Sequence, residues 1–172
     1  MKHWKPAAIA ALWSGALYAA PMPVVASFSI LGDVAQQIGG ERVAVQNLVG
    51  ANQDAHAYNL TSSDIKKIRE ARLVLLNGLG LEKAELQRAV KQSKVASAEA
   101  TASIKPLAAD EHHHEHGHDH DHDQGEFDPH VWNDPVLMQR YAANVAIALI
   151  KADPAGSRYY QQRFKDYQHV LN

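Results

Sequence analysis

Two isolated histidines carry around them the residue types that a metal site needs. His56 lies in the run Asp54-Ala55-His56-Ala57-Tyr58, and His130 lies in Asp128-Pro129-His130-Val131-Trp132. A carboxylate near a ligating imidazole can accept its second ring proton and fix its tautomer. A lone histidine in a loop is more often a hydrogen-bonding residue than a ligand. The repeated pattern nevertheless predicts His56 and His130 as ligands of one metal ion, with Asp54 and Asp128 behind them.

A third group of histidines lies between residues 109 and 126, where they alternate with acidic residues. These are His112, His113, His114, His116, His118, His120 and His122. Such a composition cannot form a packed core and predicts a loop. Neutral imidazole is the ligand form, so we expect weak, exchangeable metal capture that fades as pH falls through about 6.5. An expression tag is the alternative, but tags sit at termini and are not mixed with acids.

The chain has 11 histidines and no cysteine, so its metal donors are imidazole and carboxylate. These donors suit zinc, manganese, nickel or copper(II). The net charge of −2 and the apolar fraction of 46% describe an ordinary globular protein. They offer no electrostatic basis for binding nucleic acid or an anionic membrane.

Strand-like and helix-like runs alternate in the first half of the chain. Apolar, β-branched runs predict strands at 24–30, 43–49, 73–76 and 94–98. Helices are expected at 34–38, from the capping box Thr61-Ser62-Ser63-Asp64, and from Glu82. This alternation predicts an α/β fold with a parallel sheet covered on both faces. Ligands of such sheets bind beyond the carboxyl ends of the strands, and His56 follows the second strand. The ring nitrogens of His56 and His130 should therefore lie within about 3–5 Å of each other, because zinc–nitrogen bonds are about 2.0–2.1 Å.

The last part of the chain is helical. Asp134-Pro135 matches an N-cap and first-turn pair, followed by an apolar stripe. The stripe comprises Leu137, Met138, Tyr141, Val145, Ala148 and Leu149. Asp153-Pro154 starts another helix, in which Tyr160, Phe164, Tyr167 and Leu171 recur at helical spacing. The stripe continues to Asn172 without a C-cap, which favours the start of a longer helix whose stripe is only partly covered. A helix that docks back on the sheet is the alternative.

The first 20 residues have the pattern of an export signal. Lys2 and Lys5 precede an apolar run from Ala7 to Ala20, too short for a membrane span of about 20 residues but suited to a signal peptide. Pro21 and Pro23 end the run, and no cysteine follows it. The sequence therefore predicts a soluble periplasmic protein that is not membrane-embedded after signal removal and has no lipid anchor.

At its motifs the sequence resembles the cluster A-I solute-binding proteins of metal ABC transporters, which bind zinc or manganese for uptake. The matching segments are 27–33, Asp54-Ala55-His56 with Thr61-Ser62-Ser63-Asp64, 77–82, and Asp128-Pro129-His130-Val131-Trp132. The family fold implies two Rossmann-like α/β lobes joined by a long helix, with the metal between them. The first lobe supplies two ligands, His56 and His130 by motif match. A histidine or glutamate and an acidic residue of the second lobe usually complete the site.

The resemblance therefore implies a signal peptide at 1–20, an N-terminal metal-binding lobe at 21–152 and the start of the connecting helix at 153–172. The second lobe would be absent. Two local departures stand beside His56. Ala55 replaces a proline or carboxylate of many relatives and cannot be a ligand, and Ala57 replaces a commonly acidic residue.

The function implied is non-enzymatic capture of zinc, with manganese second, for delivery to the membrane permease of an ABC importer. The histidine-rich insertion is similar to that of zinc members, and some relatives have also been called adhesins. One alternative is a metal buffer or chaperone that acts through the loop at 109–126. A zinc hydrolase is another alternative, but it needs about three protein ligands and a base, and no helical His-Glu-x-x-His motif is present.

Overall fold

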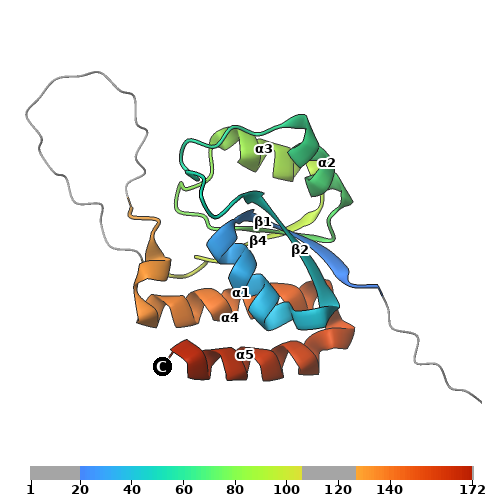
Figure 1. Cartoon of the computed structure of the whole chain (residues 1–172), viewed down its shortest axis with the longest axis vertical. Helices are drawn as coiled ribbons and strands as arrows, with labels where there is room; N and C mark the ends of the chain where they lie inside the picture. The colour runs from blue at the N-terminus through green and yellow to red at the C-terminus, as the bar shows by residue number, and fades with distance from the viewer. Residues whose placement is uncertain (1–19, 106–126, 172) are drawn as a thin grey trace, which may run out of the picture.

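A computed structural model of the chain describes residues 20–105 and 127–171 (Figure 1). Within these residues lies one sheet of four parallel strands in the order β2-β1-β3-β4. The strands are β1 Met22–Phe28, β2 Val43–Val49, β3 Leu73–Leu76 and β4 Ala96–Glu99. The helices are α1 Ser29–Gly39, α2 Ser62–Glu70, α3 Ala84–Ser93, α4 Pro135–Ala152 and α5 Ser157–Leu171. Three short 3-10 helices complete the set: η1 Gly40–Arg42, η2 Val131–Asn133 and η3 Pro154–Gly156.

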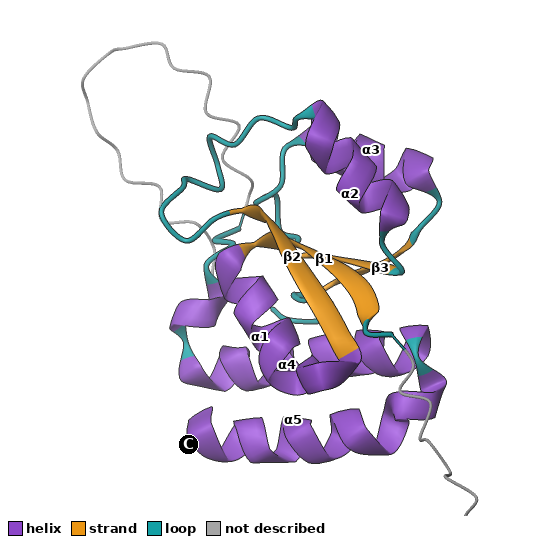
Figure 2. Cartoon of the chain, turned by 45° about the vertical axis from the view of Figure 1, so that its right-hand side comes forward, coloured by secondary structure: helices purple, strands orange, loops and turns teal. Residues whose placement is uncertain are grey.

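Helices cover both faces of the sheet, as the alternating pattern predicts. Helices α2 and α3 lie on one face, α1 and α4 lie on the other, and α5 packs outside α1 and α4 (Figure 2). Successive residues of β1 point to opposite faces, because side chains alternate along a strand. Val24 and Ala26 therefore belong to the core under α1 and α4, and Val25 belongs to the core under α2 and α3. The predicted α/β class with a doubly covered parallel sheet is confirmed.

Strands β2 and β3 have the predicted bounds, whereas the bounds of β1, α1 and β4 and the start of α3 differ from the predicted ones. The largest difference is in α1, which begins at Ser29 rather than at Val34. Strand β1 ends at Phe28 because Ser29 already begins α1. Helix α3 begins at Ala84 rather than Glu82, because the Glu82 carboxylate accepts hydrogen bonds from the β1 and β3 ends. Strand β4 starts at Ala96, since Lys94 has a left-handed φ of 59° and closes α3.

Helix α5 folds back along α4 instead of leaving the domain. Asp153 sets the turn between them: its carboxylate accepts from the Gly156 amide, the Tyr160 hydroxyl and the Arg42 guanidinium. The sequence predicts that the apolar stripe of this helix is only partly covered. Tyr160 is fully buried, so this prediction is wrong for Tyr160. Phe164, Tyr167 and Leu171 are half-buried, as partial cover predicts. Helix α5 packs mainly against α1 and α4.

Some sequence predictions fall outside the described residues. The signal peptide at 1–20 lies there except for its last residue, and the histidine-rich segment lies there entirely. The division at residue 153 between lobe and connecting helix also stays a prediction. Among the residues that the structure places, no helix has both the length and the apolar character that a bilayer crossing needs.

Candidate metal centre

The two motif histidines meet at the carboxyl edge of the sheet. His56 lies in the irregular segment 50–61 between β2 and α2, and His130 directly precedes η2, which leads into α4. Their Nε2 atoms are 3.2 Å apart and their ring centroids 5.3 Å apart. The expected proximity of the rings is met. One ion at about 2.0–2.1 Å from both nitrogens is compatible with this separation.

His130 is held by both its backbone and its ring. Asp128 Oδ1 accepts a hydrogen bond from the His130 amide at 2.9 Å and lies 2.6 Å from ring atom Nδ1. With the proton on Nδ1, the lone pair of Nε2 points toward His56. The backbone hydrogen bond from His130, aided by the ring contact, holds the pKa of Asp128 below its usual value. Trp132 packs edge-on against the His130 ring and also contacts the Phe28 ring at a tilt of 48°. The predicted arrangement of Asp128 behind His130 is therefore present.

His56 is held differently. Asp54 Oδ1 accepts from the His56 amide at 2.8 Å. In the described part of the chain this carboxylate thus binds the backbone of His56 and not its ring, unlike the arrangement predicted for Asp54. With the His130 proton on Nδ1, a neutral His56 would donate from its own Nε2 across the 3.2 Å gap. Binding of an ion between the rings would require the neutral His56 ring to change tautomer, with its proton on Nδ1 and the lone pair on Nε2.

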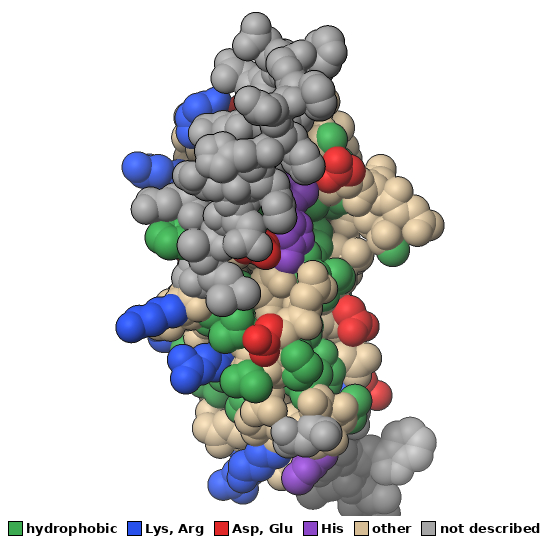
Figure 3. Space-filling model, turned by 90° about the vertical axis from the view of Figure 1, so that its left-hand side faces the viewer, with side chains coloured by type: hydrophobic (Ala, Val, Ile, Leu, Met, Phe, Trp, Pro, Cys, Tyr) green, Lys and Arg blue, Asp and Glu red, His purple; other side chains and the backbone are tan. Residues whose placement is uncertain are grey.

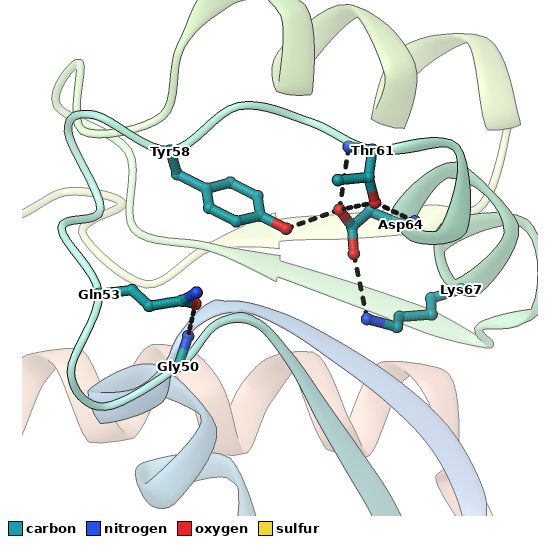
Figure 4. Close-up of polar contacts among 6 residues, drawn as sticks. All are labelled: Gly50, Gln53, Tyr58, Thr61, Asp64 and Lys67. Carbon is teal, nitrogen blue, oxygen red and sulfur yellow. Dashed lines mark hydrogen bonds and ion pairs between the residues drawn. The ribbon is translucent and has the colours of Figure 1, made fainter.

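Two side chains outside the predicted set fasten the segment that carries His56. Tyr58 donates its hydroxyl proton to Asp64 Oδ2 at 2.6 Å, across the gap between the segment and helix α2 (Figure 4). Lys83, next to α3, donates to the Ala57 carbonyl at 3.2 Å and to Asn59 Oδ1 at 3.1 Å. At the start of the segment, Gln53 closes a turn by accepting from the Gly50 amide (Figure 4).

A buried asparagine lies behind His130. Asn77, at the end of β3, is fully buried and donates from Nδ2 to the Pro129 carbonyl at 3.1 Å. The Tyr141 hydroxyl of α4 donates to Asn77 Oδ1 at 3.0 Å. Burial raises the pKa of Tyr141, with a smaller contribution from the Glu82 charge. The sequence places Asn77 only at a strand boundary. Its occurrence directly after a fully apolar strand is the signal that could have revealed a buried polar role.

The described residues contain no group of three or more histidine, cysteine, aspartate or glutamate side chains placed to hold one ion. His56 and His130 therefore form a two-nitrogen site in this part of the chain. Figure 3 shows histidine side chains at the surface on the face that it displays, beside apolar and acidic ones. The seven histidines from His112 to His122 lie outside the described residues, so their capture role stays a prediction.

Residues 24–172 match the family model of the zinc-uptake complex component A, periplasmic. The chain belongs to this family, which confirms the resemblance to metal ABC transporter solute-binding proteins.

Curated relatives are also named as metal-binding proteins. The manganese ABC transporter substrate-binding lipoprotein PsaA of Streptococcus anginosus is 30% identical over 88% of this chain and 48% of that protein. The manganese-binding lipoprotein MntA of Halalkalibacterium halodurans is 33% identical over 87% of this chain and 46% of that protein. The chain thus spans about half the length of these relatives.

Solved structures agree with the fold. The Mn-bound periplasmic metal binding protein of Candidatus Liberibacter asiaticus superposes with a TM-score of 0.74 at 32% identity, over 87% of this chain and 52% of that one. Zn(II)-bound AdcA of Streptococcus pneumoniae also gives a TM-score of 0.74, over 88% of this chain and 30% of that one. Its identity of 21% supports the shared fold alone.

Proposed function

We propose that this chain is the metal-capturing lobe of a periplasmic solute-binding protein, with Zn²⁺ as its cargo and His56 Nε2 and His130 Nε2 as ligands. The observation that carries the proposal is the pair of Nε2 atoms 3.2 Å apart, one of them oriented by Asp128. Such a pair offers two lone pairs to one ion once the ring proton of neutral His56 has moved from Nε2 to Nδ1.

The donor set favours zinc over manganese. Zinc accepts imidazole nitrogen readily, whereas manganese prefers a larger share of oxygen donors. PsaA and MntA are named for manganese, and the Candidatus Liberibacter asiaticus protein at 32% identity is described as Mn-bound, so Mn²⁺ is the second candidate. A four-coordinate ion has two positions left beside His56 and His130, which water or groups of a second lobe would fill.

The implied partner is the membrane permease of an ABC importer, and the implied location is the periplasm, after removal of the signal peptide at 1–20. Family membership and the names of the relatives support both. The same match favours a carrier over the metal buffer and the zinc hydrolase. The absence of a lipid anchor stays a prediction from the sequence, and several relatives are named lipoproteins.

Zinc titration of the chain without its signal segment tests the proposal, compared with a version that also lacks residues 111–123. The full chain should bind more than one ion, mostly through the histidine-rich segment and easily removed by a chelator. The deletion variant should keep one weaker site. That site should disappear on His56→Ala or on His130→Ala.

His169→Ala is the matched control, because His169 is an exposed histidine of α5 outside the site. It should leave the binding curve of the deletion variant unchanged. A residual site that survives both His56→Ala and His130→Ala would contradict the assignment of ligands.

A further inference from the structure

We propose that Tyr58 and Asp64 are positioning residues, which hold the segment 50–61 so that His56 faces His130. The proposal rests on the proposed role of His56 as a ligand. Neither residue contacts the ion in this arrangement. They act on His56 through the backbone that links it to Tyr58.

The segment that carries His56 needs such an anchor because it has no regular secondary structure between β2 and α2. His56, Ala57 and Asn59 are exposed, whereas Tyr58 is half-buried. The Tyr58 ring packs against the apolar clusters on both faces of the sheet. Its hydroxyl donates to Asp64 Oδ2 at 2.6 Å (Figure 4). Ala55 and Leu60 of the segment also pack against these clusters, but Tyr58 is the inward-facing residue that donates a side-chain hydrogen bond to helix α2.

Asp64 is a rigid acceptor for that hydroxyl. It is 2% exposed and occupies the third position of α2, where it completes the capping box with Thr61. Besides Tyr58, its carboxylate accepts from the Thr61 amide at 3.0 Å, the Thr61 hydroxyl at 2.5 Å and Lys67 Nζ at 3.0 Å. Burial raises the pKa of Asp64, but hydrogen bonds from Thr61, Tyr58 and Lys67 outweigh this and lower it to about 2. The carboxylate is thus charged and fixed at neutral pH.

The bond between Tyr58 and Asp64 restrains the chain that follows His56. Further contacts restrain the backbone at His56 and Ala57. Asp54 accepts from the His56 amide, and Lys83 donates to the Ala57 carbonyl. Asp54 lies within the same exposed segment and Lys83 is exposed, so neither provides a buried fixed point. Without the bond between Tyr58 and Asp64, the segment would populate conformations in which His56 points away from His130. The apparent affinity for an ion then falls by the fraction of molecules that remain competent.

A double-mutant cycle tests this inference in the chain without its signal segment and without residues 111–123, so that the histidine-rich segment does not mask the site. Zinc affinity is measured for the unmutated chain, Tyr58→Phe, His56→Ala, and the double variant. Tyr58→Phe keeps the ring and removes the donor. It should weaken His56-dependent binding about threefold to tenfold, because outer residues around metal sites commonly change affinity by at least that much. In the His56→Ala background the same change should have no effect. Asp64→Asn should weaken binding more, since either orientation of the amide loses acceptors for Tyr58, Thr61 or Lys67.

Tyr160→Phe is the matched control, because it removes an equivalent tyrosine–aspartate hydrogen bond, to Asp153, on the far side of α4. It should lower the urea midpoint and leave zinc affinity unchanged. If Tyr58→Phe lowers only the urea midpoint, as the control does, the residue is structural and the inference is wrong. If Tyr58→Phe weakens zinc binding equally with and without His56, it acts elsewhere and the inference is also wrong. If His56→Ala itself changes nothing, the proposed function fails instead.

Discussion

The two histidines of the site are held by opposite means. The His130 ring is fixed by Asp128, and the backbone before it is fixed by the fully buried Asn77. The His56 segment is held through its backbone, by Asp54, by the exposed Lys83 and by Tyr58 two residues away. The two histidine rings thus meet at one site, but the His130 ring is restrained directly and the His56 ring only through its backbone. Preorganisation reduces the cost of binding, so His130 is the prepared half of the site and His56 is the adjustable half.

The largest expected effect is on the prepared half. Asn77→Ala removes the partner of the Tyr141 hydroxyl and the Pro129 carbonyl. Each unsatisfied buried polar group costs about 1–3 kcal/mol, so the free energy of unfolding should fall by about 3 kcal/mol, measured by urea denaturation. Asn59→Ala is the control: this exposed asparagine accepts only from Lys83 among its described contacts, and its loss should cost under about 0.5 kcal/mol. If Asn77→Ala and Asn59→Ala lowered the free energy of unfolding equally, the backbone near His130 would not be held more firmly than the His56 segment.

The second effect concerns Asp64, which restrains the adjustable half. Its pKa is lowered to about 2 in the folded chain, so its contribution to stability is complete above the unfolded value of about 3.9 and is lost as pH falls toward 2. This contribution is about 2 kcal/mol. Asp64→Asn should therefore reduce stability at pH 7 and flatten the loss of stability between about pH 4 and pH 2. An unchanged acid limb in urea titrations at several pH values would contradict this assignment.

The third effect separates ring orientation from backbone orientation. Asp128→Ala should weaken zinc binding about tenfold, because it frees the tautomer and rotation of the His130 ring. Stability should hardly change, since the side chains of His130 and Asp128 are 41% and 47% exposed. Asp54→Ala, which removes a backbone contact of His56, should weaken binding only about twofold. The affinities can be compared by chelator competition in the variant lacking 111–123. If Asp54→Ala weakened zinc binding more than Asp128→Ala, His56 rather than His130 would be the more firmly held ligand.

The smallest effect is expected at Lys83. Lys83→Met keeps most of the aliphatic stem but removes the donors to Ala57 and Asn59. Because the ammonium is exposed, water can replace it, and zinc affinity should fall no more than about twofold. Lys91→Met, at an exposed position of the last turn of α3, should have no effect in the same titration. A tenfold loss at Lys83 would show that this contact is a main restraint on His56.

The sequence predicts the elements of this fold better than it predicts what fastens the site. Strands β2 and β3 follow directly from their apolar runs, and the capping box at Thr61 begins α2 as expected. The later start of α3 depends on a tertiary contact, because Glu82 binds the strand ends instead of starting the helix. Local pattern cannot reveal contacts of this kind.

The same distinction applies to the candidate site. His56 and His130 are recognisable because each repeats a short motif with an aspartate. Asn77, Tyr58 and Lys83 act on residues 52, 6 and 26 positions away, so their roles depend on the folded arrangement. Asp54 and Asp128 occupy the same place in their motifs, yet only Asp128 contacts a ring. The local backbone decides this difference, and the motif does not encode it.

The central position of β1 imposes an order on folding. This strand comes first among the four in the chain, but it lies between β2 and β3. Val24, Val25 and Ala26 pair with residues 73–75 as well as with β2. During synthesis, β1 therefore keeps one edge open until about 50 further residues have emerged, a gap whose closure slows folding. In that interval the open edge can pair with other chains, so this strand is exposed to mispairing until β3 has been made.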